Sequence, residues 1–304
     1  MSEVPGTVRR GNQAKPDPEG VQEQPMSLKR ELENPTSPLR TTLEAMLPDL
    51  GPHMRSTWNP QMKGTVARFN PDLPGDVLGH AISERIAWQF SGTGGHLHGV
   101  TVLDMAGTHA DVLDGLIEAM LDPCPGVDAD REARIACLVG LADRSLRTGL
   151  AEEPWYEPLL GARTVEEALA AVDPAWVDDV ISTTTAALSA LTPLAANTPV
   201  VRAPTFAGSR AVRGADADLI LDTTLLEVKA VRSASLAKRD LQQVVTYSLL
   251  DWDDQYELTE VAMLSARHGQ LIRWPLNDLM TGASRGAHDL DSARAHLKAA
   301  LESR

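Results

Sequence analysis

The spacing of apolar residues along this chain changes near residue 199 from a helical period to an alternating one. The predicted helix 174–191 has the clearest start, with Asp173 at the N-cap and Pro174 in the first turn. Upstream of residue 199, the spacing predicts helices at 76–90, 110–122, 128–148, 164–172 and 174–191. Downstream, alternation predicts strands at 199–206, 216–222, 225–231, 259–266 and 270–274, with helices at 236–250 and 292–302.

The N-terminal part shows little of either pattern. Residues 1 to about 36 are rich in Pro, Glu, Gln, Lys and Arg, which is typical of a disordered tail. A short helix is expected at 37–46, and the prolines and isolated aromatic residues of 51–74 indicate irregular structure. We therefore expect a largely disordered tail at 1–50, a mainly helical region at 51–173 and an α/β domain at 174–304.

The composition allows one large domain or two small ones. The 304 residues are 43% hydrophobic, which is enough for a substantial core. The two cysteines, Cys124 and Cys137, have no neighbours at metal-binding spacing and make a disulfide framework unexpected, which indicates a cytoplasmic protein. No apolar run approaches the length that spans a bilayer, and residues 1–25 lack the core of a signal peptide, so no membrane partner is expected.

The formal net charge of −14 argues against a protein that coats nucleic acid with its whole surface. The stretch from 202 to 239 differs from the rest, because it has seven basic residues against four acidic ones, a local charge of +3. If a metal neutralised two of these acids, the neighbourhood would become distinctly positive. Candidates for phosphate binding are Arg213, Arg232, Lys238 and Arg239.

Carboxylates interrupt the apolar hairpin pattern of residues 214–230 at positions suited to a divalent metal. Asp218 lies on the first strand and Glu227 on the returning strand, so the two can approach each other across the pair. Glu227 and Lys229 are two residues apart and share a face. Mg²⁺ binds a few carboxylate oxygens, and a lysine beside it can orient or deprotonate a water. Asp216 is a competing candidate for the first acid.

A surface hairpin with solvated charges is the plain alternative. Leu225, Leu226, Val228 and Ala230 argue against it, because they indicate a strand that is buried on at least one face. Buried Glu and Lys are rare unless they are paired or bound to something.

Asp218, Glu227 and Lys229 together resemble the metal site of the PD-(D/E)XK nuclease superfamily, which has the restriction-endonuclease-like fold. In that family an Asp ends one strand and an acidic-X-Lys lies on the next. Ala217 replaces the proline that precedes the first acid in many members. Asp218 is preferred to Asp216 because three apolar residues follow it directly, as is usual in the family.

Gln243 and Tyr247 on the predicted helix 236–250 resemble the Gln-X-X-X-Tyr motif of the RecB-like branch, where the Gln helps to hold the site. Asp178 and Asp179 lie on the preceding helix, from which many family members take a further acid. The resemblance covers roughly the last 130 residues. It implies an α/β fold with a restriction-endonuclease-like mixed sheet flanked by helices, preceded by a mainly helical region and a disordered N-terminal tail. The predicted order of helix, three strands, helix and strand agrees with this core.

The resemblance implies a metal-dependent nuclease that hydrolyses phosphodiester bonds, with DNA expected rather than RNA. Lys229 would orient the attacking water, and region 51–173 would shape a substrate channel or bind a protein partner. The alternatives are a non-catalytic nucleic-acid-binding or regulatory protein that retains the fold, or a mostly helical protein with incidental hairpin charges. The catalytic residues implied are Asp218, Glu227, Lys229, Gln243 and Tyr247. The ligands implied for Mg²⁺ or Mn²⁺ are Asp218, Glu227 and the main-chain carbonyl of Val228.

Two further features leave alternatives open. His96 and His98 in a Gly-rich loop could hold zinc only with additional ligands, and histidines of a flexible turn or a folded core are the alternative. Lys238 and Arg239 lie in the first turn of the predicted helix, where the helix dipole disfavours cations. Bound phosphate or compensation by Asp240 would explain their placement.

Overall fold

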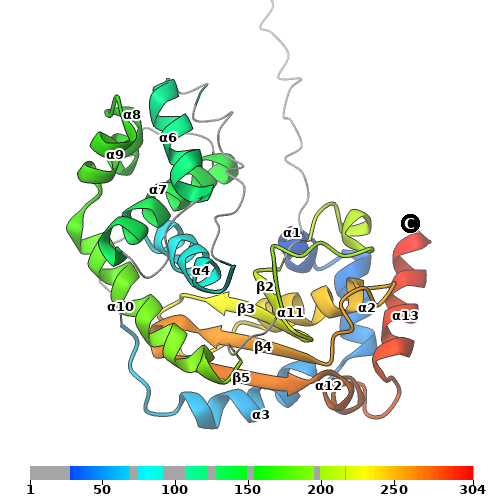
Figure 1. The fold of residues 1–304 in the computed structure, drawn as a ribbon. Coiled ribbons are helices and arrows are strands. Elements are labelled where there is room, and N and C mark those ends of the chain that lie inside the picture. Colours follow the sequence, from blue (N-terminus) through cyan, green and yellow to red (C-terminus); the bar gives the residue numbers. More distant parts are fainter. Residues whose placement is uncertain are drawn as a thin grey trace, which may run out of the picture.

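A five-stranded mixed sheet with helices on both faces forms the centre of the molecule (Figure 1). The computed structural model describes residues 28–68, 74–91, 104, 107–121, 128–148, 154–194, 199–215 and 217–303. The strands neighbour one another in chain order and are β1 (Val200–Arg202), β2 (Leu219–Leu221), β3 (Thr224–Lys229), β4 (Glu260–Ser265) and β5 (Gln270–Pro275). The expectation of an α/β fold with a mixed sheet flanked by helices is confirmed.

The strand pairs are antiparallel except for β3 and β4, which run parallel. A parallel pair needs a crossover connection, and α11 (Lys238–Leu250) provides it. β2 and β3 form the expected hairpin, with Leu219 opposite Leu226 and Leu221 opposite Thr224. Asp222 in its turn has a φ of 55°, a left-handed conformation that Asp tolerates better than most residues.

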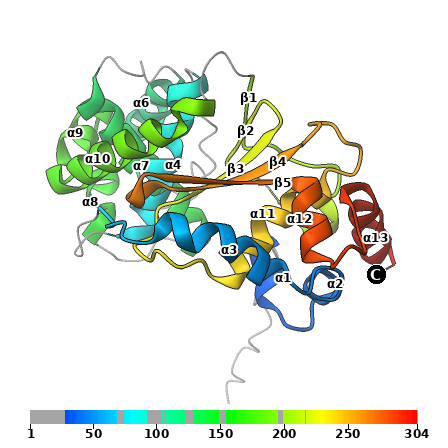
Figure 2. The ribbon, with the colours of Figure 1, turned by 90° about the horizontal axis from the view of Figure 1, so that it is seen from below.

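Side-chain alternation divides the sheet between two hydrophobic cores. On one face, Leu226 and Val228 of β3 and Leu264 of β4 pack with α4 (Gly75–Ser91), α7 (Ala129–Thr148) and α10 (Pro174–Leu191). On the other face, Leu225 and Met263 pack with α11. Figure 2 shows the sheet nearly edge-on between these groups of helices. Because both faces are covered, β3 reads as an almost continuous apolar run in which Glu227 and Lys229 stand out.

The helical lobe consists of α4, α6 (Ala110–Leu121), α7, α8 (Glu157–Leu160) and α9 (Val165–Ala171). α10 follows it and packs on α4, α7, β4 and β5. Asp173 accepts a hydrogen bond from Ala175 N, as an N-cap should. Gly140 brings α7 close to α4, because a Cβ at this position would lie 2.5 Å from the Val77 carbonyl oxygen. No helix in the described ranges is both long and apolar enough to cross a membrane.

In the described part of the chain, three helices precede the lobe, namely α1 (Leu28–Glu33), α2 (Pro38–Met46) and α3 (Leu50–Met62). α2 confirms the helix expected at 37–46. α3 lies where irregular structure was expected, and that expectation was wrong. Leu50, Met54, Trp58 and Met62 recur every four residues on α3, and all four are buried. Trp58 Nε1 also donates a hydrogen bond to the Ala234 carbonyl at 2.7 Å.

These three helices pack against α11, β5, α12 (Leu276–Ala283) and α13 (Leu290–Glu302). We call the sheet together with α1, α2, α3, α11, α12 and α13 the sheet body. Residues 28–68 thus belong to the sheet body, which differs from the expected tail at 1–50 and from a helical region that begins at 51. Leu28, Leu32, Leu39 and Leu43 complete the core on the α11 face, and their burial accounts for the difference.

Candidate functional site

Asp218 and Glu227 lie opposite each other at one end of the β2–β3 hairpin. The register pairs Leu219 with Leu226, so the next pair toward this end is Asp218 with Glu227. Asp218 Oδ2 accepts a hydrogen bond of 2.6 Å from Val228 N, and the Asp218 carbonyl accepts one of 3.1 Å from Ala203 N. The carboxylate of Asp218 is therefore fixed against the backbone of β3.

Lys229 lies on the same face of β3 as Glu227 and is held by three side chains. Its Nζ donates to Glu227 Oε1 at 2.8 Å and to Gln243 Oε1 at 3.0 Å, and it lies 3.6 Å from Asp240 Oδ1. Gln243 Nε2 in turn donates to Tyr247 Oη at 2.8 Å. The structure thus brings together Lys229, Glu227, Gln243 and Tyr247, and the hairpin register adds Asp218.

The rotation of α11 agrees with this arrangement. Leu241 and Val244 are fully buried in the core of the sheet body, whereas Gln243 is turned toward Lys229. Residues four apart lie on one side of a helix, so Tyr247 can support Gln243 from the next turn.

Electrostatics at the site favours extra positive charge. Burial, and then the negative charge of Glu227, raise the pKa of Asp218 to about 8, against the opposing effects of the Val228 N–H, Lys229 and a hydrogen bond from Ser83. Burial acts to lower the pKa of Lys229, but Glu227, Asp240 and Asp218 outweigh it and hold this pKa above its usual value. One lysine therefore faces three carboxyl groups.

The residues present fit a hard divalent cation. Asp218, Glu227 and the main-chain carbonyl of Val228 offer oxygen atoms, and Mg²⁺ commonly uses one or two carboxylates while it keeps several waters. Within the described ranges, no group of three or more His, Cys, Asp or Glu side chains is placed to hold a metal ion. The fit therefore rests on two carboxylates and a carbonyl. Asp216, the competing first acid, lies outside the described residues.

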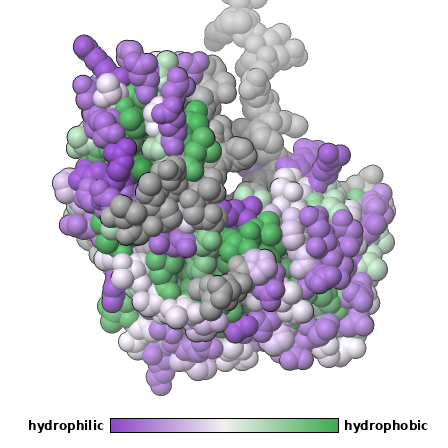
Figure 3. All heavy atoms as spheres, in the orientation of Figure 1, coloured by the Kyte–Doolittle hydropathy of each residue, from purple (hydrophilic) through white to green (hydrophobic). Residues whose placement is uncertain are grey.

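The contribution of α4 to this site was not predicted from the sequence. Ser83 of α4 donates a hydrogen bond to the Asp218 carboxylate, and one turn earlier Gly79 lies next to Ala230. Glu84 fastens the same helix to β1 through a 2.6 Å ion pair with Arg202. The feature of the sequence that could have indicated it is a stripe of polar residues on the otherwise apolar helix α4. Figure 3 shows that the face seen there is hollowed between the helical lobe and the sheet body.

The four phosphate-binding candidates are dispersed. Lys238 Nζ donates to Glu44 Oε1 at 2.8 Å, and Arg239 pairs with Glu33. Arg213 and Arg232 are exposed on loops. Compensation of the two cations on α11 thus comes chiefly from α1 and α2. Asp240, the residue considered for it, lies 4.0 Å from Arg239 and closer to Lys229.

Asp179 of α10 is engaged away from the two carboxylates. Both of its oxygens accept hydrogen bonds of 2.9 Å from Arg267, which also donates to the Ala230 and Arg68 carbonyls. Asp178 beside it is exposed. His96 and His98 lie outside the described residues.

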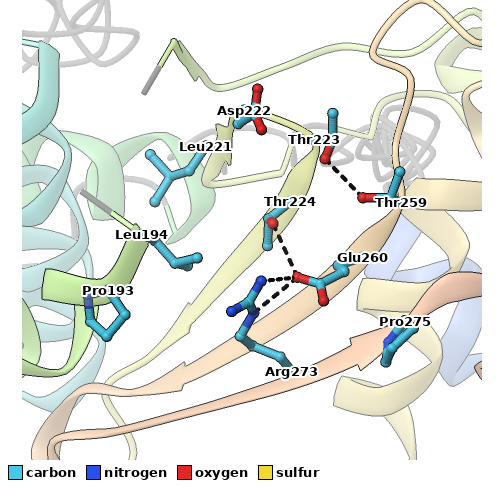
Figure 4. Close-up of a pocket in the computed structure, with 10 residues that line it drawn as sticks. All are labelled: Pro193, Leu194, Leu221, Asp222, Thr223, Thr224, Thr259, Glu260, Arg273 and Pro275. Atoms are coloured by element: carbon cyan, nitrogen blue, oxygen red, sulfur yellow. Dashed lines mark hydrogen bonds and ion pairs between the residues drawn. The ribbon is translucent and has the colours of Figure 1, made fainter. Parts of the chain in front are cut away.

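A separate hollow of about 490 Å³ lies at the opposite end of the β2–β3 hairpin (Figure 4). Of its charged groups, Glu260 and Arg273 pair with each other, Thr224 also donates to Glu260, and Asp222 lies at the hairpin turn. Thr223 and Thr259 share a 2.8 Å hydrogen bond across its rim. None of the predicted catalytic residues lines it.

Comparisons of this chain with protein-family models, with curated proteins and with solved structures gave no match.

Proposed function

We propose that this protein is a metal-dependent nuclease of the PD-(D/E)XK type that hydrolyses phosphodiester bonds, with DNA as the expected substrate. The observation that carries the proposal is the opposed pair Asp218 and Glu227, with Lys229 bound between Glu227 and Gln243. The resemblance of these residues to the superfamily and the mixed sheet that carries them support it.

Each residue has a separate task in this proposal. Asp218, Glu227 and the Val228 carbonyl would hold Mg²⁺ or Mn²⁺, which when bound supplies charge stabilisation and a more acidic water. Two of the three N–H donors of Lys229 bind Glu227 and Gln243. Asp240 Oδ1, at 3.6 Å, is beyond hydrogen-bond distance, so the third donor can orient a water or a phosphate oxygen. Tyr247 keeps the Gln243 amide turned toward Lys229.

One observation favours the non-catalytic alternative, a nucleic-acid-binding or regulatory protein that retains the fold. Lys229 Nζ lies 2.8 Å from Glu227 and neutralises that carboxylate without a metal. A self-compensated pair of this kind can be purely structural.

Cleavage assays distinguish the nuclease from the non-catalytic alternative. Purified protein would be incubated with plasmid, linear duplex, single-stranded DNA and RNA, each with Mg²⁺, Mn²⁺ or chelator. We expect metal-dependent cleavage by the wild type and its loss in Asp218→Asn. Asp222→Asn is the matched control, because it makes the same change at the other end of β2 and Asn tolerates the left-handed backbone there. The proposal is wrong if Asp218→Asn cleaves as fast as wild type, or if the wild type cleaves none of these substrates.

A further inference from the structure

Two glutamates of the N-terminal helices lie on the first turn of α11. Glu44 of α2 accepts hydrogen bonds from Lys238 Nζ at 2.8 Å, from Arg40 Nε of its own helix at 2.9 Å and from Gln242 Nε2 at 3.4 Å. Glu33, the last residue of α1, pairs with Arg239. The hydrogen bond from Lys238 is the main cause that lowers the pKa of Glu44 to about 2, so this carboxylate stays ionised.

A row of alternating charges connects these pairs with the candidate site. Arg239 Nε lies 4.0 Å from Asp240 Oδ1, and the same oxygen lies 3.6 Å from Lys229 Nζ. Lys229 is bound to Glu227. The cations at the start of α11 are therefore close enough to guide a charged chain into the site.

Both glutamate pairs are exposed, so another anion can replace either glutamate. The side chains of Lys238 and Glu44 are 56% and 35% exposed, and those of Arg239 and Glu33 are 38% and 46% exposed. Exposed pairs of this kind contribute at most about 1 kcal/mol each. Next to Glu44 and Lys238 lies a hollow of about 210 Å³, to which Arg55 adds a further cation.

We propose, resting on the proposed function, that Lys238 and Arg239 bind the phosphates of a nucleic-acid strand on its way to Lys229. In the free protein, Glu33 and Glu44 occupy the same cations as internal competitors. A strand carries one negative charge per nucleotide and can replace both carboxylates at once. The α1–α2 segment thereby sets how tightly the substrate binds.

The test uses the double variant Glu33→Gln, Glu44→Gln of the full chain. Binding of a fluorescent single-stranded oligonucleotide and of a duplex is measured by anisotropy in chelator, so that cleavage does not interfere. We expect Kd to fall about five- to thirtyfold for at least one of the two, the range that release of Lys238 and Arg239 from exposed ion pairs allows. Arg40, which also loses its pair with Glu44, stays bound to the Leu32 and Glu33 carbonyls. The slope of log affinity against log salt should steepen by about 1.4 for a single strand, because two more phosphates are bound.

The matched control is Glu166→Gln, Glu302→Gln, which removes the same charge from exposed glutamates paired with Arg131 and Lys298. An equal gain in this control would overturn the proposal, because net charge alone would explain it. The proposal would also be overturned if the test variant showed no gain in affinity, or if no variant bound either oligonucleotide. In a Lys238→Gln, Arg239→Gln background the glutamate substitutions should give no gain.

The two proposals fail separately. Metal-dependent cleavage by the wild type without tighter binding by the variant would overturn the internal competition alone. Tighter oligonucleotide binding by the variant without cleavage of any substrate would support the internal competition and overturn the proposed nuclease activity.

Discussion

Asp218 is subject to two competing equilibria. Burial and the charge of Glu227 raise its pKa to about 8, so the metal-free site retains a proton near neutral pH. Metal ligation requires the ionised carboxylate. Cations and protons therefore compete for the same oxygen atoms.

Asp218→Asn should stabilise the metal-free protein increasingly as the pH rises. The carboxyl ionises near its ordinary pKa of 3.8 in the unfolded chain but at about 8 in the folded one. The wild type therefore has this contribution in full below pH 4 and loses it progressively up to pH 8. Since the amide does not ionise, the melting temperature of Asp218→Asn in chelator should exceed that of wild type by several degrees at pH 8.5 and by little at pH 4.5.

Asp222→Asn controls for the loss of a surface charge on the same hairpin. A difference between Asp218→Asn and wild type that does not grow with pH would show that Asp218 ionises freely in the fold.

Lys229→Ala should slow cleavage and leave metal binding largely intact. A positioned acid or base contributes about 10²- to 10⁴-fold to the rate, which corresponds to about 3 to 5 kcal/mol. Single-turnover cleavage with saturating Mn²⁺ measures the rate, and calorimetry with Mn²⁺ measures binding. The exposed Lys298 provides the control Lys298→Ala. Unchanged single-turnover rates in Lys229→Ala would remove Lys229 from the mechanism.

At the scale of elements, Arg267 joins three segments of the chain. It binds Asp179 of α10, the Ala230 carbonyl at the end of β3 and the Arg68 carbonyl after α3. The Arg267 and Asp179 side chains are 4% and 6% exposed. A guanidinium in this position depends on its partner, because water cannot replace the carboxylate.

Asp179→Asn should therefore lower the free energy of unfolding by about 3 to 5 kcal/mol. Asp178→Asn changes the neighbouring exposed residue and should have an effect below about 0.5 kcal/mol. Urea denaturation of both variants measures the difference. Equal stabilities would mean that the ion pair is dispensable to the junction of α10 with the sheet.

The elements that the sequence predicted well are those with an uninterrupted period. The helices α4, α6, α7, α10 and α11 and the strands β3 to β5 begin and end within two residues of their predicted bounds. α3 was missed because Pro52 and Pro60 obscured its four-residue spacing, although Pro52 lies in the first turn and Pro60 near the end. α12 was missed because eight residues give too few repeats to establish a period.

The residues of the candidate site also fall into those that the sequence predicted and those that it did not. Asp218 immediately precedes β2, and Glu227, Lys229 and Gln243 lie on the next two main elements, β3 and α11, so strand alternation and helix rotation were enough to bring them together. Ser83, Glu33 and Glu44 reach the same region from distant segments. Their positions follow from tertiary packing, which a single sequence does not encode as a local pattern.

At the scale of the whole molecule, one core joins the helical lobe to the sheet. Buried residues of α4, α7 and α10 form a continuous cluster with Leu226 and Val228 of β3. Cys137 of α7 lies within it, and burial raises the pKa of its thiol. The thiolate, which is the reactive form, is therefore suppressed in the folded state.

Cys137 should react with a thiol reagent only when the whole molecule unfolds. In a Cys124→Ser background, labelling of Cys137 is measured across a urea series and compared with circular dichroism of the same samples. The shared core predicts that the two transitions coincide. Labelling at lower urea would show that the lobe opens on its own. Buffer pH and reagent concentration are held constant across the series.

The contacts of Arg267 also bear on how this architecture can be modified. Arg68, which precedes the helical lobe, and Asp179, which follows it, both meet this one side chain. The polypeptide thus leaves the sheet body and returns to it at nearly the same point. A segment inserted between adjacent ends places little entropic strain on its host. The helical lobe between them can consequently be exchanged or reshaped, while the strands that position Asp218, Glu227 and Lys229 keep their register.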